Sequence, residues 1–419
     1  MICISSNLNW SKNYQTGILE SDAKGYYAYL PALFIYKDLN FGFFEKIEKV
    51  KYYNKNLFYD YRSNSNGKVI NKYYCGTALA ELPFFFIAYL SDYMMNFESD
   101  GYSGLHAVFI SIAALFYLII GLFYLNLTLS IYEIKEWQKT LTLFASLFGT
   151  NLFYYSVTEP GMSHIYSFSF ISMFVFFSKK YFSTYRDKYI PKLALILGII
   201  VLIRPVNGLI ILILPFIAGN KNVFWAGLKS ILGNTKYLIT SCLIFAGIVS
   251  IQLIIYKIST GNFFVYSYGD EGFNFSKPHI IDILFSYKKG LFLYTPLYLL
   301  SLTGCFFLWK SSRYEFYSMF GFFIVITYVL SSWWMWFYGG SFSSRVFVEF
   351  IPVFMILLAL SLKNLNNFKI ANRIYMLLII LLIVICQIQT YQYRYYQIHW
   401  SEMTKEKYWN VFLRIDKLI

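Results

Sequence analysis

Long apolar runs recur along this chain of 419 residues, and they constrain its fold more than any other feature. Each of nine runs is close to the ~20 residues that an α-helix needs to cross a bilayer. Hydrophobic residues make up 58% of the chain, whereas soluble domains contain roughly 45–50%. The sequence therefore predicts an all-α polytopic membrane protein. The expected spans are 104–130, 138–156, 163–182, 192–218, 237–258, 290–309, 316–334, 346–362 and 374–391.

The run 192–218 is interrupted by a polar stretch at 204–208, which reads RPVNG. Proline removes a backbone hydrogen bond, and a charge at membrane depth is costly unless it faces water or protein. We therefore expect two short helices that enter the membrane and return to the same side. With this returning pair, loops carrying 15 Lys and Arg all fall on one side, which the positive-inside rule makes cytoplasmic. The net charge of +14 thus reflects topology and does not indicate a nucleic-acid partner. The basic loops are 131–139, 179–192, 219–236, 310–315 and 363–373.

This topology predicts an exported first loop at 1–103, a transmembrane bundle at 104–391 and a C-terminal tail at 392–419. The segments 157–162, 259–289 and 335–345 also face outward, whereas the side of the tail is left open because it carries five Lys and Arg. A long segment is exported only behind a signal or an inserted helix, so we expect a first transmembrane helix encoded upstream of Met1.

The short apolar stretch at 82–97 contains Asp92, which favours a helix lying on the membrane surface. The alternative is that 82–97 spans the membrane and leaves 1–81 in the cytoplasm.

The polar stretch 21–32 precedes the first long span. Ser21 is a suitable helix N-cap, which places Asp22 in the first turn and Tyr26 on the same face. A carboxylate at a helix N-terminus stays ionised, because the dipole and free N–H groups stabilise negative charge, and it could act as a general base. The alternative, which the residues alone favour, is a solvated aspartate beside a membrane-edge tyrosine cluster.

Other outward segments also carry chemically active side chains. Arg204 and Arg345 are the most informative, because a guanidinium near hydrocarbon usually pairs with an acid or binds an anion, and Glu349 is a structural partner to consider for Arg345. Each of the other candidates also has an ordinary structural explanation. The Trp and Tyr residues would form interfacial belts, Asp270 and Glu271 a solvated turn, and His164 a hydrogen bond within the bundle. The remaining candidates are Glu159 and His164 in the turn 158–164, Asp270 and Glu271 at 266–275, and Lys277 and His279 at the start of an amphipathic interfacial helix.

As a set, five motifs resemble a bacterial family of integral membrane glycosyltransferase-like proteins of the GT-C superfamily, and the resemblance covers most of the chain. The motifs are DAKGYYAYLPA at 22–32, EPGMSH at 159–164, RPVN at 204–207, GDEGFNF with KPHI and KKGLFLYTP at 269–296, and WWMWFYGGSFSSR at 333–345. The resemblance implies about 10–11 transmembrane helices of GT-C type, with exported loops that carry short amphipathic helices.

The resemblance also implies a reaction: transfer of a sugar from a polyprenyl-phosphate donor to a glycan, glycolipid or protein, on the exofacial side of the bacterial inner membrane. Asp22 matches the catalytic acidic residue of the first exported loop and would take the acceptor's proton. Arg204 or Arg345, with Lys24 as a further candidate, would stabilise the leaving phosphate, with inversion at the anomeric carbon.

No cofactor is required by this scheme, although a divalent metal on Glu159, Asp270 or Glu271 is left open. The residues expected to bind substrate are Lys24, Tyr26, Glu159, His164, Arg204, Asp270, Glu271, Lys277, His279 and Arg345. The competing functions are a transporter or flippase for lipid-linked sugars and a polysaccharide polymerase or ligase.

Overall fold

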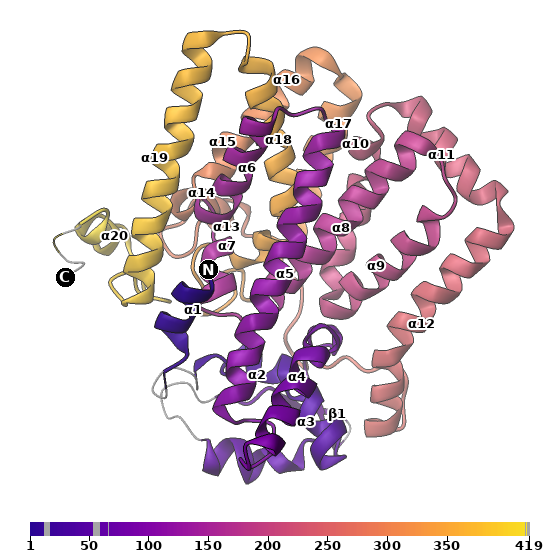
Figure 1. Ribbon diagram of the computed structural model, residues 1–419, viewed down its shortest axis with the longest axis vertical. Coiled ribbons are helices and arrows are strands. Elements are labelled where there is room, and N and C mark those ends of the chain that lie inside the picture. Colours follow the sequence, from indigo (N-terminus) through magenta and orange to yellow (C-terminus); the bar gives the residue numbers. More distant parts are fainter. Residues whose placement is uncertain (12–16, 53–58, 66, 415, 417–419) are drawn as a thin grey trace.

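The computed structural model describes residues 1–11, 17–52, 59–65, 67–414 and 416, and most of them are helical. Five of the helical segments are long and apolar enough to cross a membrane. Figure 1 shows the long helices running side by side as a bundle, with the elements between residues 21 and 94 gathered at its lower end. The long or central helices are α5 (Gly104–Ile131), α8 (Ser163–Thr184), α9 (Tyr189–Ile203), α12 (Thr235–Thr260), α17 (Arg313–Ser331), α18 (Ile351–Leu365) and α19 (Lys369–Arg394).

Burial divides these helices into an inner and an outer set. Every residue of α18 from Ile351 to Ala359 is buried, because this helix is apolar on all sides and lies within the bundle. In contrast, α12 exposes large apolar side chains such as Leu243 and Ile258, and α19 exposes Leu377 in the same way. An apolar outer surface of this kind fits a lipid bilayer.

Two of the predicted spans are wrong as single continuous helices. The run 138–156 divides into α6 (Glu136–Phe148) and α7 (Leu152–Val157). This break places Asn151 where its side chain accepts a hydrogen bond from the hydroxyl of Tyr298. The run 290–309 divides into α14 (Leu291–Tyr294), α15 (Leu297–Ser301) and α16 (Thr303–Ser311). The run 346–362 is continuous, because the 3-10 helix η6 (Arg345–Phe350) leads directly into α18, and together they are long and apolar enough to cross a membrane.

The run 192–218 reverses direction at Arg204. Helix α9 ends at Ile203, and the chain continues as η5 (Pro205–Ile213) and α10 (Leu214–Ala218). Asn207 donates to Ser167 near the start of α8, and Ile217 accepts from Lys179 near its end, so the second half runs parallel to α8. Tyr189 contacts Phe177, so α9 runs the opposite way. The break thus produces an antiparallel helix pair, and its relation to a membrane stays a prediction.

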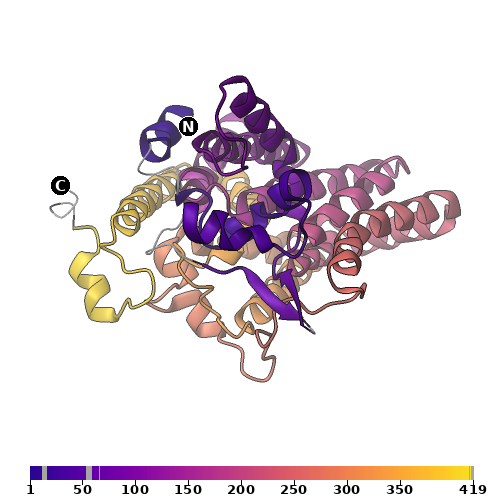
Figure 2. The ribbon, with the colours of Figure 1, turned by 90° about the horizontal axis from the view of Figure 1, so that it is seen from below.

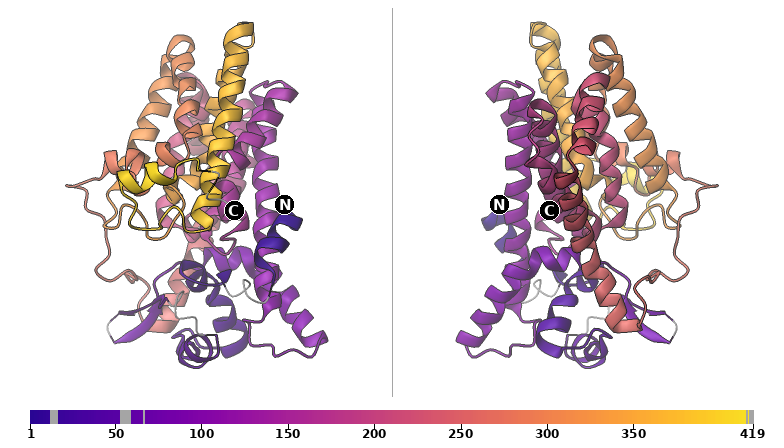
Figure 3. Two further views of the ribbon diagram at one scale, coloured as in Figure 1. Left: turned by 90° about the vertical axis from the view of Figure 1, so that its left-hand side faces the viewer. Right: turned by 90° about the vertical axis from the view of Figure 1, so that its right-hand side faces the viewer.

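The described residues between 17 and 100 form a compact region at one end of the bundle, called the first region below (Figures 2 and 3). A two-stranded antiparallel hairpin, in which Ser63 pairs with Ile70, lies at the edge of this region. The sequence analysis did not predict this hairpin. The region contains α2 (Asp22–Tyr27), α3 (Tyr29–Pro31), η2 (Ala32–Tyr36), η3 (Gly42–Glu45), η4 (Ile47–Lys51), β1 (Arg62–Ser65) and β2 (Lys68–Asn71). Helix α1 (Ile2–Asn9) lies apart from it beside the bundle, where Asn9 donates to the carbonyl of Val157.

Helix α4 (Gly76–Met94) joins this region to the bundle. Its first residue lies so close to the end of α9 that a side chain at Gly76 would overlap the backbone of Leu202 and Ile203. Asp92 lies within α4, where it is fully buried and accepts from the Ser103 hydroxyl. The expected position of this helix on the membrane surface stays a prediction. The remaining helices are α11 (Lys221–Gly233), α13 (Ile280–Phe285) and α20 (Lys405–Val411).

Candidate functional site

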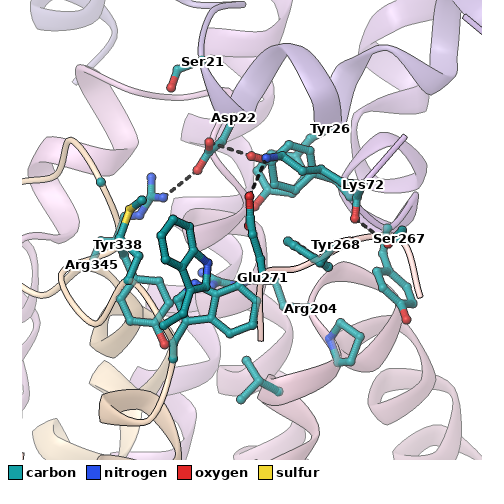
Figure 4. Close-up of a pocket in the computed structure, with 18 of the residues that line it drawn as sticks. Ser21, Asp22, Tyr26, Lys72, Arg204, Ser267, Tyr268, Glu271, Tyr338 and Arg345 are labelled. Carbon is teal, nitrogen blue, oxygen red and sulfur yellow. Dashed lines mark hydrogen bonds and ion pairs between the residues drawn. The ribbon is translucent and has the colours of Figure 1, made fainter. Parts of the chain in front are cut away.

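A cavity of about 490 Å³ lies where the first region meets the bundle (Figure 4). Its walls come from α2, from Tyr59 before the β-hairpin, from the segment 72–74 after it, from the turn between α9 and η5, and from the later loops 266–273 and 333–345. Its lining combines charged groups with many aromatic rings, which is a composition suited to a polar ligand with ring faces. The lining residues are Ser21, Asp22, Tyr26, Tyr59, Lys72, Tyr73, Tyr74, Ile203, Arg204, Pro205, Val206, Tyr266, Ser267, Tyr268, Glu271, Phe273, Trp333, Trp334, Met335, Tyr338, Gly339, Gly340 and Arg345.

Helix α2 presents Asp22 to this cavity. Asp22 lies in the first turn, as expected, and Tyr26 lines the cavity one turn later. The expected cap is wrong, because the Ser21 side chain makes no capping hydrogen bond and its backbone has a positive φ of 57°. Both oxygens of the Asp22 carboxylate are instead bound by side chains from elsewhere in the chain.

Asp22 is held between a guanidinium and a phenol. Arg345 Nη2 lies 2.6 Å from Asp22 Oδ2, and the Tyr73 hydroxyl donates to Oδ1 at 2.7 Å. The hydroxyl of Tyr59 lies 2.7 Å from that of Tyr73 and extends the chain of hydrogen bonds. Burial alone would raise the pKa of Asp22, but the charge of Arg345 and the hydrogen bond from Tyr73 hold it below its usual 3.8. The carboxylate is therefore ionised near neutral pH.

Arg345 is positioned by a tightly bonded loop at 338–345. Tyr338 and Ser343 have positive φ angles in this loop, and non-glycine residues hold such angles only when surrounding contacts fix them. The backbone N–H of Phe342 donates to the hydroxyl of Tyr155, and the buried ammonium of Lys289 donates to the carbonyl of Ser341. Burial lowers the pKa of Lys289 to about 7. The loop that carries Arg345 is thus fixed from behind the cavity.

Arg204 reaches the same cavity from the reversal between α9 and η5. Its Nη1 lies 3.0 Å from Oε1 of Glu349, which is fully buried, and His164 Nδ1 lies 3.0 Å from the same oxygen. The sequence analysis considered Glu349 as a partner of Arg345, which is wrong because Glu349 pairs with Arg204 and His164. His164 therefore supports the site from within the bundle and does not line it.

On the other side of the cavity, an ion pair between Lys72 and Glu271 connects two segments of the chain. Lys72 Nζ lies 3.2 Å from Glu271 Oε1 and connects the end of the hairpin to the segment 266–275. That segment is fixed at two further points, because Ser267 accepts from Ser63 through its carbonyl and Trp334 donates its N–H to the carbonyl of Gly272. These contacts bring the exported segments predicted at 1–103 and 259–289 together.

Lys24 faces away from Asp22, which contradicts its expected role at the phosphate. It lines a separate cavity of about 70 Å³ and pairs with Glu20 at 2.7 Å. Glu159 accepts from the Tyr154 hydroxyl at 2.9 Å, behind the cavity wall. Burial raises the pKa of Glu159 despite the hydrogen bond from Tyr154.

The other expected binding residues also lie outside the cavity lining. Asp270 and Lys277 are exposed, and His279 pairs with Asp282 at 2.9 Å on the surface. Of the eleven residues predicted for the site, the cavity lining therefore contains Asp22, Tyr26, Arg204, Glu271 and Arg345.

The sequence analysis missed Tyr59, Lys72 and Tyr73, which contact one another and Asp22 or Glu271. They lie in a tyrosine-rich stretch without a recognisable motif, and only the fold brings them to Asp22. Lys289 was also missed, although a lysine directly before an apolar run is a detectable signal.

The cavity places the cations Arg204, Arg345 and Lys72 beside the carboxylates of Asp22 and Glu271 and many ring faces. Guanidinium groups bind phosphate oxygens, and aromatic faces stack on sugar rings. Among the described residues, no three His, Cys, Asp or Glu side chains come together in a group that could hold a metal. The metal dependence of any reaction stays a prediction.

Comparison of the chain with protein-family models, curated proteins and solved structures finds no match.

Proposed function

We propose that this chain is a membrane glycosyltransferase that moves a sugar from a polyprenyl-phosphate donor to a glycan, glycolipid or protein acceptor. The observation that carries the proposal is the meeting of Asp22, Arg204 and Arg345 in one cavity, because these residues belong to three of the motifs that resemble the GT-C superfamily. A bundle of about 10–11 transmembrane helices with an exofacial site in the bacterial inner membrane belongs to the same proposal.

The proposed reaction is a single displacement. Asp22 accepts the proton of an acceptor hydroxyl, whose oxygen forms a bond to the anomeric carbon. The bond from that carbon to the phosphate oxygen breaks, and its electron pair leaves with the polyprenyl phosphate. Arg204 and Arg345 stabilise the charge on this leaving group, and attack from the opposite face inverts the anomeric carbon.

The test compares surface glycans and glycolipids in cells with the wild-type gene, Asp22→Asn and a deletion. Mass spectrometry reads the glycans, and blotting establishes equal protein in the membrane. We expect Asp22→Asn to match the deletion with one sugar missing, and the missing mass identifies the sugar class. If Asp22→Asn matches the wild type while the deletion loses glycan, the transferase assignment is wrong and a flippase becomes the better explanation.

A further inference from the structure

The contact between Asp22 and Arg345 places a base and an anion-binding group in competition. Asp22 Oδ2 accepts a hydrogen bond from Arg345 Nη2 at 2.6 Å, and the other carboxylate oxygen accepts one from the hydroxyl of Tyr73. The side chains of Asp22 and Arg345 are only 15% and 12% exposed, so little water competes for the pair. In this arrangement the guanidinium of Arg345 is bonded to the carboxylate that would have to accept the proton of the acceptor hydroxyl.

Arg345 has few other ways to satisfy its charge. Within the part of the chain that the structure describes, Asp22 is its only ion-pair partner, and its buried Nε makes no hydrogen bond. A ligand anion that enters the cavity and binds the guanidinium through Nη2 must therefore share this nitrogen with Asp22 or replace it.

Arg204 differs from Arg345 in this respect. Its Nη1 is held by Glu349, which lies outside the cavity lining, so an anion can approach from the cavity without displacing that carboxylate. Of the two guanidiniums, only that of Arg345 is bonded to a carboxylate that lines the cavity. Of the two carboxylates that hold these guanidiniums, an anion bound between them would consequently displace only Asp22.

We propose that a phosphate-bearing ligand and Asp22 compete for Arg345, so that donor binding releases the Asp22 carboxylate for the acceptor. This inference rests on the proposed function and concerns the regulation of the same site. It makes the order of binding a consequence of geometry: the donor enters first, and an acceptor hydroxyl finds a free carboxylate only afterwards.

The experiment measures the Kd of farnesyl phosphate for the full chain in detergent by titration calorimetry, with farnesol as the uncharged control. Removing the Asp22 charge removes the competitor, so we expect Asp22→Asn to bind farnesyl phosphate at least about tenfold more tightly than the wild type. Asp22→Ser is a second variant with the same expectation, in case the amide disturbs folding. In the double variant Asp22→Asn/Arg345→Gln the gain should disappear.

Asp270→Asn is the matched control, because it removes one negative charge from an exposed residue outside the cavity lining. An equal gain in this control would assign the effect to net charge and overturn the inference. Equal Kd values in the wild type, Asp22→Asn and Asp22→Ser would also overturn it, while leaving the proposed function in place. If neither the wild type nor any variant distinguishes farnesyl phosphate from farnesol, the proposed function fails and the inference fails with it.

Discussion

Arg345 and Asp22 form an ion pair across 323 positions of the sequence, with Nη2 2.6 Å from Oδ2. The pair joins the first region of the chain to the loop before α18. It is also mostly buried, so its two charges depend on each other. Both partners line the cavity, so loss of either charge leaves the other largely buried without its partner.

Removing one partner of this pair should destabilise the fold. Arg345→Gln leaves the Asp22 carboxylate buried beside Tyr73 without a cation, which typically costs about 3–5 kcal/mol. Thermal unfolding in detergent measures the loss. The double variant Asp22→Asn/Arg345→Gln should recover most of it, since no buried charge remains at this contact. A double variant as unstable as Arg345→Gln would show that the ion pair is not the cause.

Tyr73→Phe should change the pH dependence of transfer. The Tyr73 hydroxyl donates to Asp22 and helps to keep its pKa low, and a hydrogen bond to a charged group is worth about 1.5–3 kcal/mol. Its loss should move the acidic limb of the pH–rate profile upward by about one to two pH units. Tyr74→Phe is the matched control, because Tyr74 lines the same cavity, whereas the carboxylate of Asp22 is bonded to Tyr73 and Arg345. A shift of equal size in the control would contradict this role.

Glu349→Gln should weaken donor binding through Arg204. The variant removes the carboxylate that holds both Arg204 and His164, so the guanidinium loses its fixed position. We expect the KM for a lipid-phosphate donor to rise about tenfold or more, with a smaller change in kcat. Glu349→Asp keeps the charge and should recover part of the affinity. Unchanged KM in Glu349→Gln would show that Arg204 is not positioned by this contact.

The buried ammonium of Lys289 predicts a stability that rises with pH. Its pKa is about 7 in the folded protein and about 10.5 when unfolded, so between these values the unfolded chain binds more protons. Relative to Lys289→Met, the wild type should gain melting temperature from pH 7 to pH 10. Melting curves of both proteins across this range test the sign. A constant difference would mean that Lys289 titrates normally.

Lys24→Met should lower stability without changing donor KM. Lys24 pairs with Glu20 in a separate cavity, where burial raises the pKa of Glu20 to about 7 even in the presence of the lysine. Removing the lysine leaves a buried acid without its partner, and the double variant with Glu20→Gln should recover the loss. A large rise in donor KM in Lys24→Met would instead support the role at the phosphate that the sequence predicted.

The sequence predicted helices well where an uninterrupted apolar run was sufficient. The runs 104–130 and 237–258 became α5 and α12 almost residue for residue. It failed where a polar side chain has a distant partner, as at Asn151, because the hydrogen bond from Tyr298 that accompanies the break crosses 147 positions. Local periodicity contains no information about such contacts.

The residues of the candidate site also fall into those that the sequence indicated and those that it did not. Arg204 and Arg345 could be selected from sequence because a charge beside apolar runs is unusual. Asp22 was selected only through the resemblance, since its residues alone favoured a solvated aspartate, whereas the structure pairs it with Arg345 at a largely buried contact. Lys24 was misplaced because the sequence near Asp22 does not show which way each side of α2 faces. Tyr73 and Lys72 could not be selected, since tyrosine and lysine are common throughout the first region and only their position after the hairpin gives them a role.

The close approach of Gly76 to Leu202 and Ile203 has a consequence for how the protein is made. Helix α4 is synthesised long before α9, yet the surface on which its first turn rests does not exist until α9 emerges. Chain fragments that stop before Ile203 consequently lack both Arg204 and the support of α4. The contact between α4 and α9 therefore forms only after the ribosome has synthesised α9.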